Sequence, residues 1–187
     1  MNIFFTGCTH FNHANIIKLA NRPFATVGEM DWEMIERWNK VVDRNDRVYH
    51  LGDFGYVNRT LAEHLLAQLN GQKILIHGNH DDSRVFHASG WFNTLLYHEL
   101  EYAGRKLVLC HYPIEDWNGR WKGSIHLHCH THAPQLRNPS IPNPANSALD
   151  LGNRLPAEVK CNRFNVGVDA TAFAPISLEE IITESEK

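Results

Sequence analysis

Short apolar segments that each run into a polar cluster constrain the fold of this 187-residue chain more than any other feature. Segments 3–6, 47–51 and 73–77 are predicted strands. They are followed in turn by Cys8-Thr9-His10, Gly52-Asp53 and Gly78-Asn79-His80-Asp81. Segments with helical spacing lie between these strands. A strand–helix–strand order predicts an α/β fold with a mixed sheet.

The expected helices begin at recognisable caps. A short helix is predicted over 14–20, ending at Asn21-Arg22-Pro23. Capping boxes beginning at Thr26, Thr60 and Ser177 predict three further helices, because a hydroxyl and a carboxylate three residues apart satisfy free backbone amides.

Further strands are expected in the second half of the chain. Segments 95–102 and 106–111 are predicted to pair as a hairpin, and strands are also predicted over 124–129 and 164–168. His111 ends one of these strands, and His130 and His132 follow another. Because sites in open α/β sheets form beyond the carboxyl ends of strands, we expect all the polar clusters to converge on one place.

Composition places the chain among ordinary globular proteins, with 43% apolar and 21% charged residues. No stretch approaches the roughly 18 uncharged apolar residues of a membrane span, so no membrane partner is expected. The net charge of −3 gives no strong signal for long nucleic acid. Four cysteines without a C-x-x-C pair, and no secretion signal, predict a cytoplasmic protein with free thiols.

The length predicts a single domain over 1–187. One segment, 133–160, differs in composition from the rest, because it is rich in Pro and Asn and holds five of the eight prolines. Loops of this length in a compact domain are usually functional or mobile.

The chain contains thirteen histidines, which is an unusually large number. The strand ends supply several imidazoles, a carboxylate and an amide oxygen. Imidazole suits Zn, Fe and Ni, and oxygen ligands suit Mn and Mg. Such a set, with one central Asp, can bridge two ions about 3.5–4 Å apart that clamp a phosphoryl group.

The clusters, taken in order, resemble the motifs of the calcineurin-like metallophosphoesterases. That family carries D-x-H, G-D, G-N-H-[DE], a lone His and G-H-x-H. The corresponding residues here are Cys8-Thr9-His10, Gly52-Asp53, Gly78-Asn79-His80-Asp81, His111 and Cys129-His130-Thr131-His132. The resemblance covers nearly the whole chain apart from 133–160. It implies two mixed β-sheets packed as a sandwich and flanked by helices.

The resemblance also implies a role for each motif residue. One divalent ion (Mn, Fe or Zn) would be held by His10, Asp53 and His132, with Cys8 as a further ligand. A second would be held by Asp53, Asn79, His111 and His130. Asp53 would bridge the ions and a hydroxide between them would attack phosphorus. His80 would assist the leaving group.

Cys8 and Cys129 depart from the family pattern, which has Asp and Gly at these positions. A thiolate at position 8 disfavours Mn and Mg. Either this site prefers a softer metal, or its first ion is weakly held, or the side chain at position 8 does not bind metal. The departure motivates an alternative, a catalytically weak metal-binding or interaction protein of the same fold.

The expected substrate is a phosphate ester, with a phosphodiester slightly favoured over a monoester and a nucleotide as one candidate. The chain has no room for a large cap domain, so loops 112–123 and 133–160 would set specificity. His13 and Trp117 are candidate substrate contacts. His126 and His128 alternate with the motif histidines but are interpreted as hydrogen-bonded core or surface residues.

Overall fold

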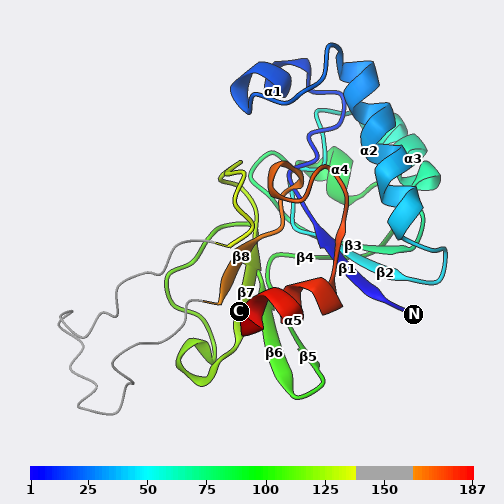
Figure 1. The fold of residues 1–187 in the computed structure, drawn as a ribbon. Coiled ribbons are helices and arrows are strands. Elements are labelled where there is room, and N and C mark those ends of the chain that lie inside the picture. The colour runs from blue at the N-terminus through cyan, green and yellow to red at the C-terminus, as the bar shows by residue number, and fades with distance from the viewer. Residues whose placement is uncertain (138–161) are drawn as a thin grey trace.

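The computed structural model describes residues 1–137 and 162–187 and contains two mixed sheets with flanking helices (Figure 1). The predicted α/β sandwich is thereby confirmed. Most of the predicted loop, residues 138–160, lies outside the described residues. No helix in the described part of the chain is long and apolar enough to cross a membrane.

The first sheet has the strand order β4-β3-β2-β1-β9. Its four parallel strands are β1 (Ile3–Thr6), β2 (Arg47–His50), β3 (Gln72–Ile76) and β4 (Trp91–Leu95). The short strand β9 (Ile176–Ser177) pairs antiparallel with β1. The parallel arrangement brings the carboxyl ends of β1, β2 and β3 to one edge.

The second sheet has the order β5-β6-β7-β8. The strands β5 (His98–Tyr102) and β6 (Arg105–Leu109) form the predicted hairpin. The strands β7 (Ile125–His128) and β8 (Arg163–Asn165) continue the sheet in parallel with β6.

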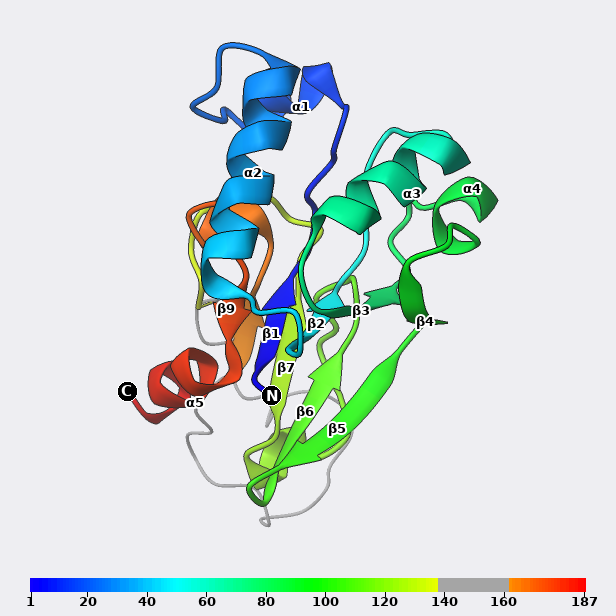
Figure 2. The ribbon, with the colours of Figure 1, turned by 90° about the vertical axis from the view of Figure 1, so that its right-hand side faces the viewer.

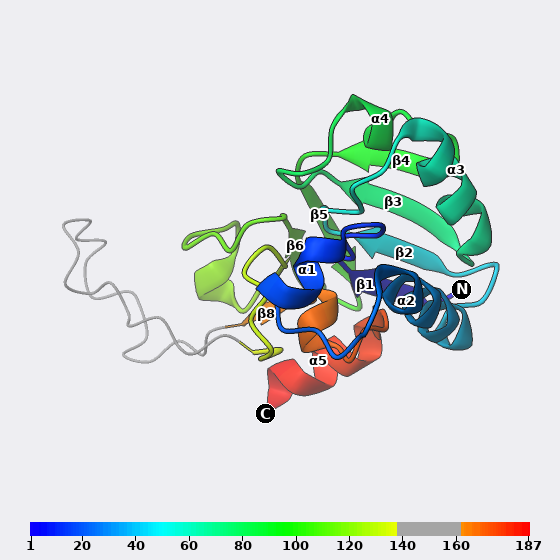
Figure 3. The ribbon, with the colours of Figure 1, turned by 90° about the horizontal axis from the view of Figure 1, so that it is seen from above.

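Three layers are visible when the molecule is seen from above (Figure 3). The helices α2 (Val27–Val41) and α3 (Arg59–Gln68) cover one face of the first sheet, and the second sheet covers the other (Figures 2 and 3). One buried cluster joins these helices to the first sheet through Met30, Trp38 and Leu66. The other lies between the sheets and includes Phe5 and Leu127.

The remaining helices are shorter. They are α1 (Ala14–Leu19), α4 (Ser83–Phe86) and α5 (Leu178–Glu186), with 3-10 turns at Arg120–Lys122 and Val168–Ala170. The predicted caps at Thr26 and Ser177 are confirmed, since each hydroxyl accepts the amide of the residue three positions on.

Two local expectations are corrected. Segment 95–102 is not one strand, because β4 ends at Leu95 in the first sheet and β5 begins at His98 in the second. The helix α3 is capped by Asn58, whose side chain accepts the Leu61 amide, and not by Thr60. Glu63 instead accepts from Arg59 and from the backbone of Ser89.

Candidate metal centre

The loops that follow β1, β2, β3, β6 and β7 meet beyond the carboxyl ends of the strands. Among the described residues, three groups of side chains could each hold a metal ion, because within each group the ligand atoms lie within 4.8 Å of one another. The groups are Cys8, His10 and His132; Asp53, His111 and His130; and Cys8, His111 and Cys129. The first two groups divide the predicted ligands between two neighbouring positions.

Asp53 lies between these two positions. Its Oδ2 is 3.5 Å from His10 Nε2 and also 3.5 Å from His111 Nε2. The other carboxylate oxygen, Oδ1, accepts the backbone amide of His80 at 2.9 Å. One oxygen is thus held by the chain while the other faces an imidazole from each group, which is the placement a bridging ligand requires.

Two glycines allow the loops carrying these residues to approach. A Cβ on Gly78 would lie 2.3 Å from Asp53 Oδ1. A Cβ on Gly52, which has a φ of +96°, would lie 2.3 Å from the Gly78 amide nitrogen. A larger residue at either position would therefore displace Asp53 or its loop.

His111 presents a lone pair to the cluster. Its Nδ1 lies 2.7 Å from the Leu51 carbonyl, which can only accept, so Nδ1 carries the proton. In the neutral ring Nε2 then carries the lone pair, and it lies 2.9 Å from Asn79 Oδ1 and 3.1 Å from His130 Nδ1. Two ring nitrogens and an amide oxygen, each of a type that binds metals, therefore meet at one place.

His10 has the matching property. Its Nε2 is buried and has no hydrogen-bond partner. Burial lowers the pKa of His10 to about 2, with the neighbouring His132 and Arg22 acting in the same direction. The imidazole is therefore neutral at ordinary pH, which is the form that binds metals. An orphaned, neutral ring nitrogen facing a carboxylate oxygen fits a metal position.

His132 is oriented by residues that the sequence interpretation missed. Its Nδ1 is 2.7 Å from Asp169 Oδ2, so the Nε2 lone pair faces away from that carboxylate. Asp169 also accepts two hydrogen bonds from Arg22, at 2.8 and 3.1 Å. Arg22 in turn donates to the backbone carbonyls of Cys8 and Thr9. A carboxylate behind a histidine ligand is a common support of metal sites.

Cys8 lies inside the cluster. Its side chain is 1% exposed, and its Sγ accepts the His130 amide at 3.0 Å. Cys129 is directly behind, and its thiol donates to the Leu51 carbonyl at 3.1 Å. Burial raises the pKa of Cys129 far above its ordinary value, so that side chain is a neutral packing thiol.

Five predicted ligands have an unusual backbone. Among the ten described non-glycine residues with positive φ are Cys8, His10, Asp53, His130 and His132, at φ values of 51–64°. A left-handed conformation costs an ordinary L-residue about 1–2 kcal/mol, and such strain clusters at functional sites.

Asp81 and His80 have separate tasks in the G-N-H-D loop. The Asp81 carboxylate accepts the amides of Asp53, Phe54 and Gly78 at 2.8–2.9 Å, so it ties the loops after β2 and β3 together. His80 is exposed, and its ring centroid lies 5.5 Å from that of His10. Its imidazole is therefore accessible above the cluster.

The remaining candidates are divided. The ring of His13 lies 5.5 Å from that of His10, beside the cluster. Trp117 is instead 6% exposed, donates to Ser124 Oγ and packs with Val108 and Ile114. A substrate contact at Trp117 therefore stays a prediction, which this burial does not support.

His126 and His128 are fully buried, as expected of core residues. The His126 ring lies within hydrogen-bonding distance of the Val108 and Tyr112 carbonyls, and the His128 ring lies 2.9 Å from the Cys129 carbonyl.

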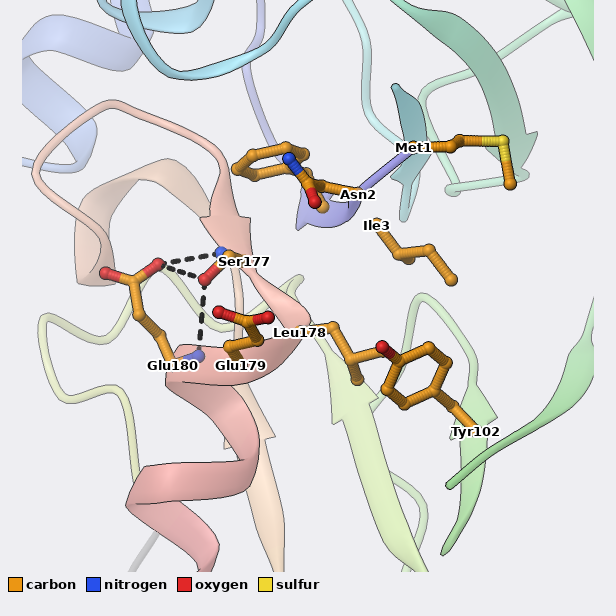
Figure 4. A pocket seen from close by; sticks show the side chains of 9 residues that line it. Met1, Asn2, Ile3, Tyr102, Ser177, Leu178, Glu179 and Glu180 are labelled. Carbon is orange, nitrogen blue, oxygen red and sulfur yellow. Dashed lines mark hydrogen bonds between the residues drawn. The ribbon is translucent and has the colours of Figure 1, made fainter. Parts of the chain in front are cut away.

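A separate hollow of about 320 Å³ lies at the other end of β1. Met1–Phe4, Tyr102 and Ser177–Glu180 line it, and the Ser177–Glu180 capping box forms part of its wall (Figure 4). None of the predicted ligands is among these residues, so the cavity is not part of the metal centre.

Comparison with known proteins supports the assignment that the motifs suggest. A family model described as calcineurin-like phosphoesterase matches residues 1–159. The uncharacterized protein MJ1445 of Methanocaldococcus jannaschii is 35% identical over 187 residues, covering 99% of this chain and 92% of that protein. The gene 66 protein of Mycobacterium phage L5 is 27% identical over 165 residues, covering 72% and 79% respectively.

A solved structure shows the same fold. The protein of unknown function AQ665 from Aquifex aeolicus matches with a TM-score of 0.69 and 23% identity, over 98% of each chain. Since the family model spans most of the sequence, and the motif residues lie together at the strand ends, the chain belongs to the calcineurin-like phosphoesterase family.

Proposed function

We propose that this protein is a single-domain, cytoplasmic hydrolase of phosphate esters that uses two divalent ions. The observation that carries the proposal is the position of Asp53 Oδ2, 3.5 Å from the Nε2 atoms of both His10 and His111. His10, His132 and Cys8 would complete one metal position. Asn79, His111 and His130 would complete the other.

The donor set fits Mn, Fe or Zn, because it mixes imidazole with carboxylate and amide oxygens. When bound, two such ions activate water and neutralise charge on the phosphoryl group. The exposed imidazole of His80 holds a proton for the leaving-group oxygen, and the amide of His80 keeps Asp53 in place. His13, whose ring lies beside that of His10, would contact the phosphate.

A phosphodiester is the favoured substrate, with a nucleotide as the candidate. A diester carries one negative charge at neutral pH, whereas a monoester carries nearly two. Arg22, the buried cation behind the cluster, is already paired with Asp169 and adds little charge for a dianion. The lower demand for positive charge therefore favours the diester.

Metal content and turnover test the proposal together. The purified protein is analysed for bound metal, and p-nitrophenyl phosphate is compared with its bis ester in the presence of Mn, Zn, Fe or Mg. We expect metal-dependent turnover that is faster with the bis ester. Less than about one ion per chain and no turnover with any metal would overturn the proposal. Bound metal without turnover would favour the alternative, a catalytically weak metal-binding or interaction protein of the same fold.

His80→Ala separates catalysis from metal binding. We expect kcat to fall by about 100-fold or more while metal content is unchanged, because general acid assistance contributes at least that factor. The matched control is His64→Ala, which removes another exposed histidine and should leave kcat as it is. Loss of metal in the His80 variant would contradict the role given to His80.

A further inference from the structure

Tyr56 is an exposed aromatic side chain on a buried loop. It is 73% exposed, whereas its neighbours Phe54 and Val57 are at most 6% exposed. It follows Asp53 by three residues. An aromatic ring left in solvent beside a candidate active site forgoes the burial that its apolar surface favours.

The backbone of Tyr56 is fixed by the loop that carries His10. The Tyr56 amide donates to the Phe11 carbonyl at 2.8 Å, and Asn12 Nδ2 donates to the Tyr56 carbonyl at 3.0 Å. The two loops cross so closely that a Cβ on Gly55 would lie 2.8 Å from the Phe11 oxygen. The backbone that carries the ring is therefore held at a defined place relative to the metal centre.

A row of rings connects Tyr56 to the metal centre. The Tyr56 centroid lies 5.7 Å from that of His13, with 31° between the planes, and His13 lies 5.5 Å from His10. A group attached to a phosphate beside His10 would therefore reach Tyr56 by spanning these two successive ring-to-ring distances.

A small pocket opens beside Tyr56. It has a volume of about 190 Å³ and is lined by Asn12, Tyr56, Val57, Asn58 and Arg84. Ligand pockets for whole drug-sized molecules have volumes of about 300–1,000 Å³, so this one suits a single group of a ligand.

Arg84 gives this pocket its chemistry. Its side chain is 61% exposed, and its Nε donates to Asp82 Oδ2 at 2.8 Å. Planar aromatic groups stack on guanidinium planes and on tyrosine rings alike. An aromatic ring and a guanidinium on one pocket therefore select a flat, electron-rich group.

We propose that Tyr56 and Arg84 form a subsite for a planar aromatic group of the phosphate ester, a nucleobase being the natural example. Tyr56 is then a specificity-determining residue. The inference rests on the proposed function, because the phosphate must first be held at the metal centre.

Binding of two matched product-like ligands tests the subsite. Adenosine 5′-monophosphate and ribose 5-phosphate share the phosphate and sugar and differ in the base. Each is titrated calorimetrically into Zn-loaded protein, because a thiolate at position 8 favours the softer ion. We expect the base to improve the dissociation constant about tenfold, as a stacked base does elsewhere. Tyr56→Ala should remove this difference, and Tyr56→Phe should keep it.

The controls separate the subsite from the metal centre. Ribose 5-phosphate should bind all variants equally, which also shows that each is folded. Tyr102→Ala removes a tyrosine from the hollow at the other end of β1 and should change neither constant. Equal affinities in the unchanged protein, or an equal loss for both ligands in Tyr56→Ala, would overturn the subsite. Failure of both ligands to bind would overturn the proposed function and the subsite with it.

Discussion

At the scale of single residues, we predict that the side chain at position 8 sets the metal preference of the site. The sulfur of Cys8 lies within 4.8 Å of the ligand atoms of His10 and His132. We predict that Cys8→Asp raises activity with Mn relative to Zn, because a carboxylate is a harder ligand than a thiolate. Metal content by mass spectrometry and turnover with each metal measure the change.

Cys8→Ser is the companion variant, since it keeps the size of the side chain and removes the soft ligand. We expect it to lose metal from the first position. If both variants match the unchanged protein in metal content and rate, Cys8 is not a ligand.

Asp169 lies behind His132, a predicted metal ligand, and contacts its Nδ1. We predict that Asp169→Asn weakens metal binding by about 10–100-fold, because His132 loses the carboxylate that fixes its tautomer. Metal titration followed by a competing chelator gives the affinity. Asp43→Asn, an exposed change elsewhere, is the control and should leave the affinity unaltered. An unchanged affinity in Asp169→Asn would show that His132 needs no such support.

The convergence of the motif residues was easier to predict from the sequence than the residues that orient them. The motif ligands follow strands directly, so their convergence could be inferred from strand direction alone. Arg22 and Asp169 are 147 positions apart and carry no local pattern that links them. The burial of Trp117 could not be predicted from the sequence either, because it depends on contacts with Val108 and Ile114 in the folded chain.

At the scale of elements, the start of α3 offers a direct comparison. Asn58 accepts the Leu61 amide, whereas Thr60 is exposed and lies two residues later, inside the first turn of the helix. We predict that Asn58→Ala lowers the free energy of unfolding by about 1 kcal/mol, and that Thr60→Ala changes it by much less. Urea denaturation of both variants measures the difference. Equal losses would contradict the cap at Asn58.

Elements were predictable where periodicity and caps agreed, as in α2 and α5. The break between β4 and β5 was not, because Leu95, Leu96 and Tyr97 continue the apolar run while the chain changes sheets. The strand β9 has only two residues and depends entirely on its pairing with β1.

At the scale of the whole molecule, buried histidines make stability depend on pH. Burial lowers the pKa of His50 to about 3 and that of His126 to about 4. The unfolded chain binds these protons near pH 6.5 and the folded chain does not. The free energy of unfolding should therefore fall as pH drops below 6.5, by up to about 1.4 kcal/mol per pH unit for each group.

Urea denaturation between pH 7 and pH 5 measures this slope. His126→Gln should flatten it, since Gln does not titrate, and His87→Gln, at an exposed histidine, should not. A stability that stays constant over this range would contradict the neutral, buried state of both rings.

The left-handed backbone at five of the predicted ligands affects how metal binding is divided between the folded and unfolded states. These residues are Cys8, His10, Asp53, His130 and His132. An unfolded chain rarely visits that conformation at even one of these positions, so it cannot assemble the same ligands and competes poorly for ions. Any ion bound at the centre stabilises the folded state alone, by an amount that grows with the logarithm of its free concentration. The melting temperature of this protein should therefore rise with the concentration of free metal ions.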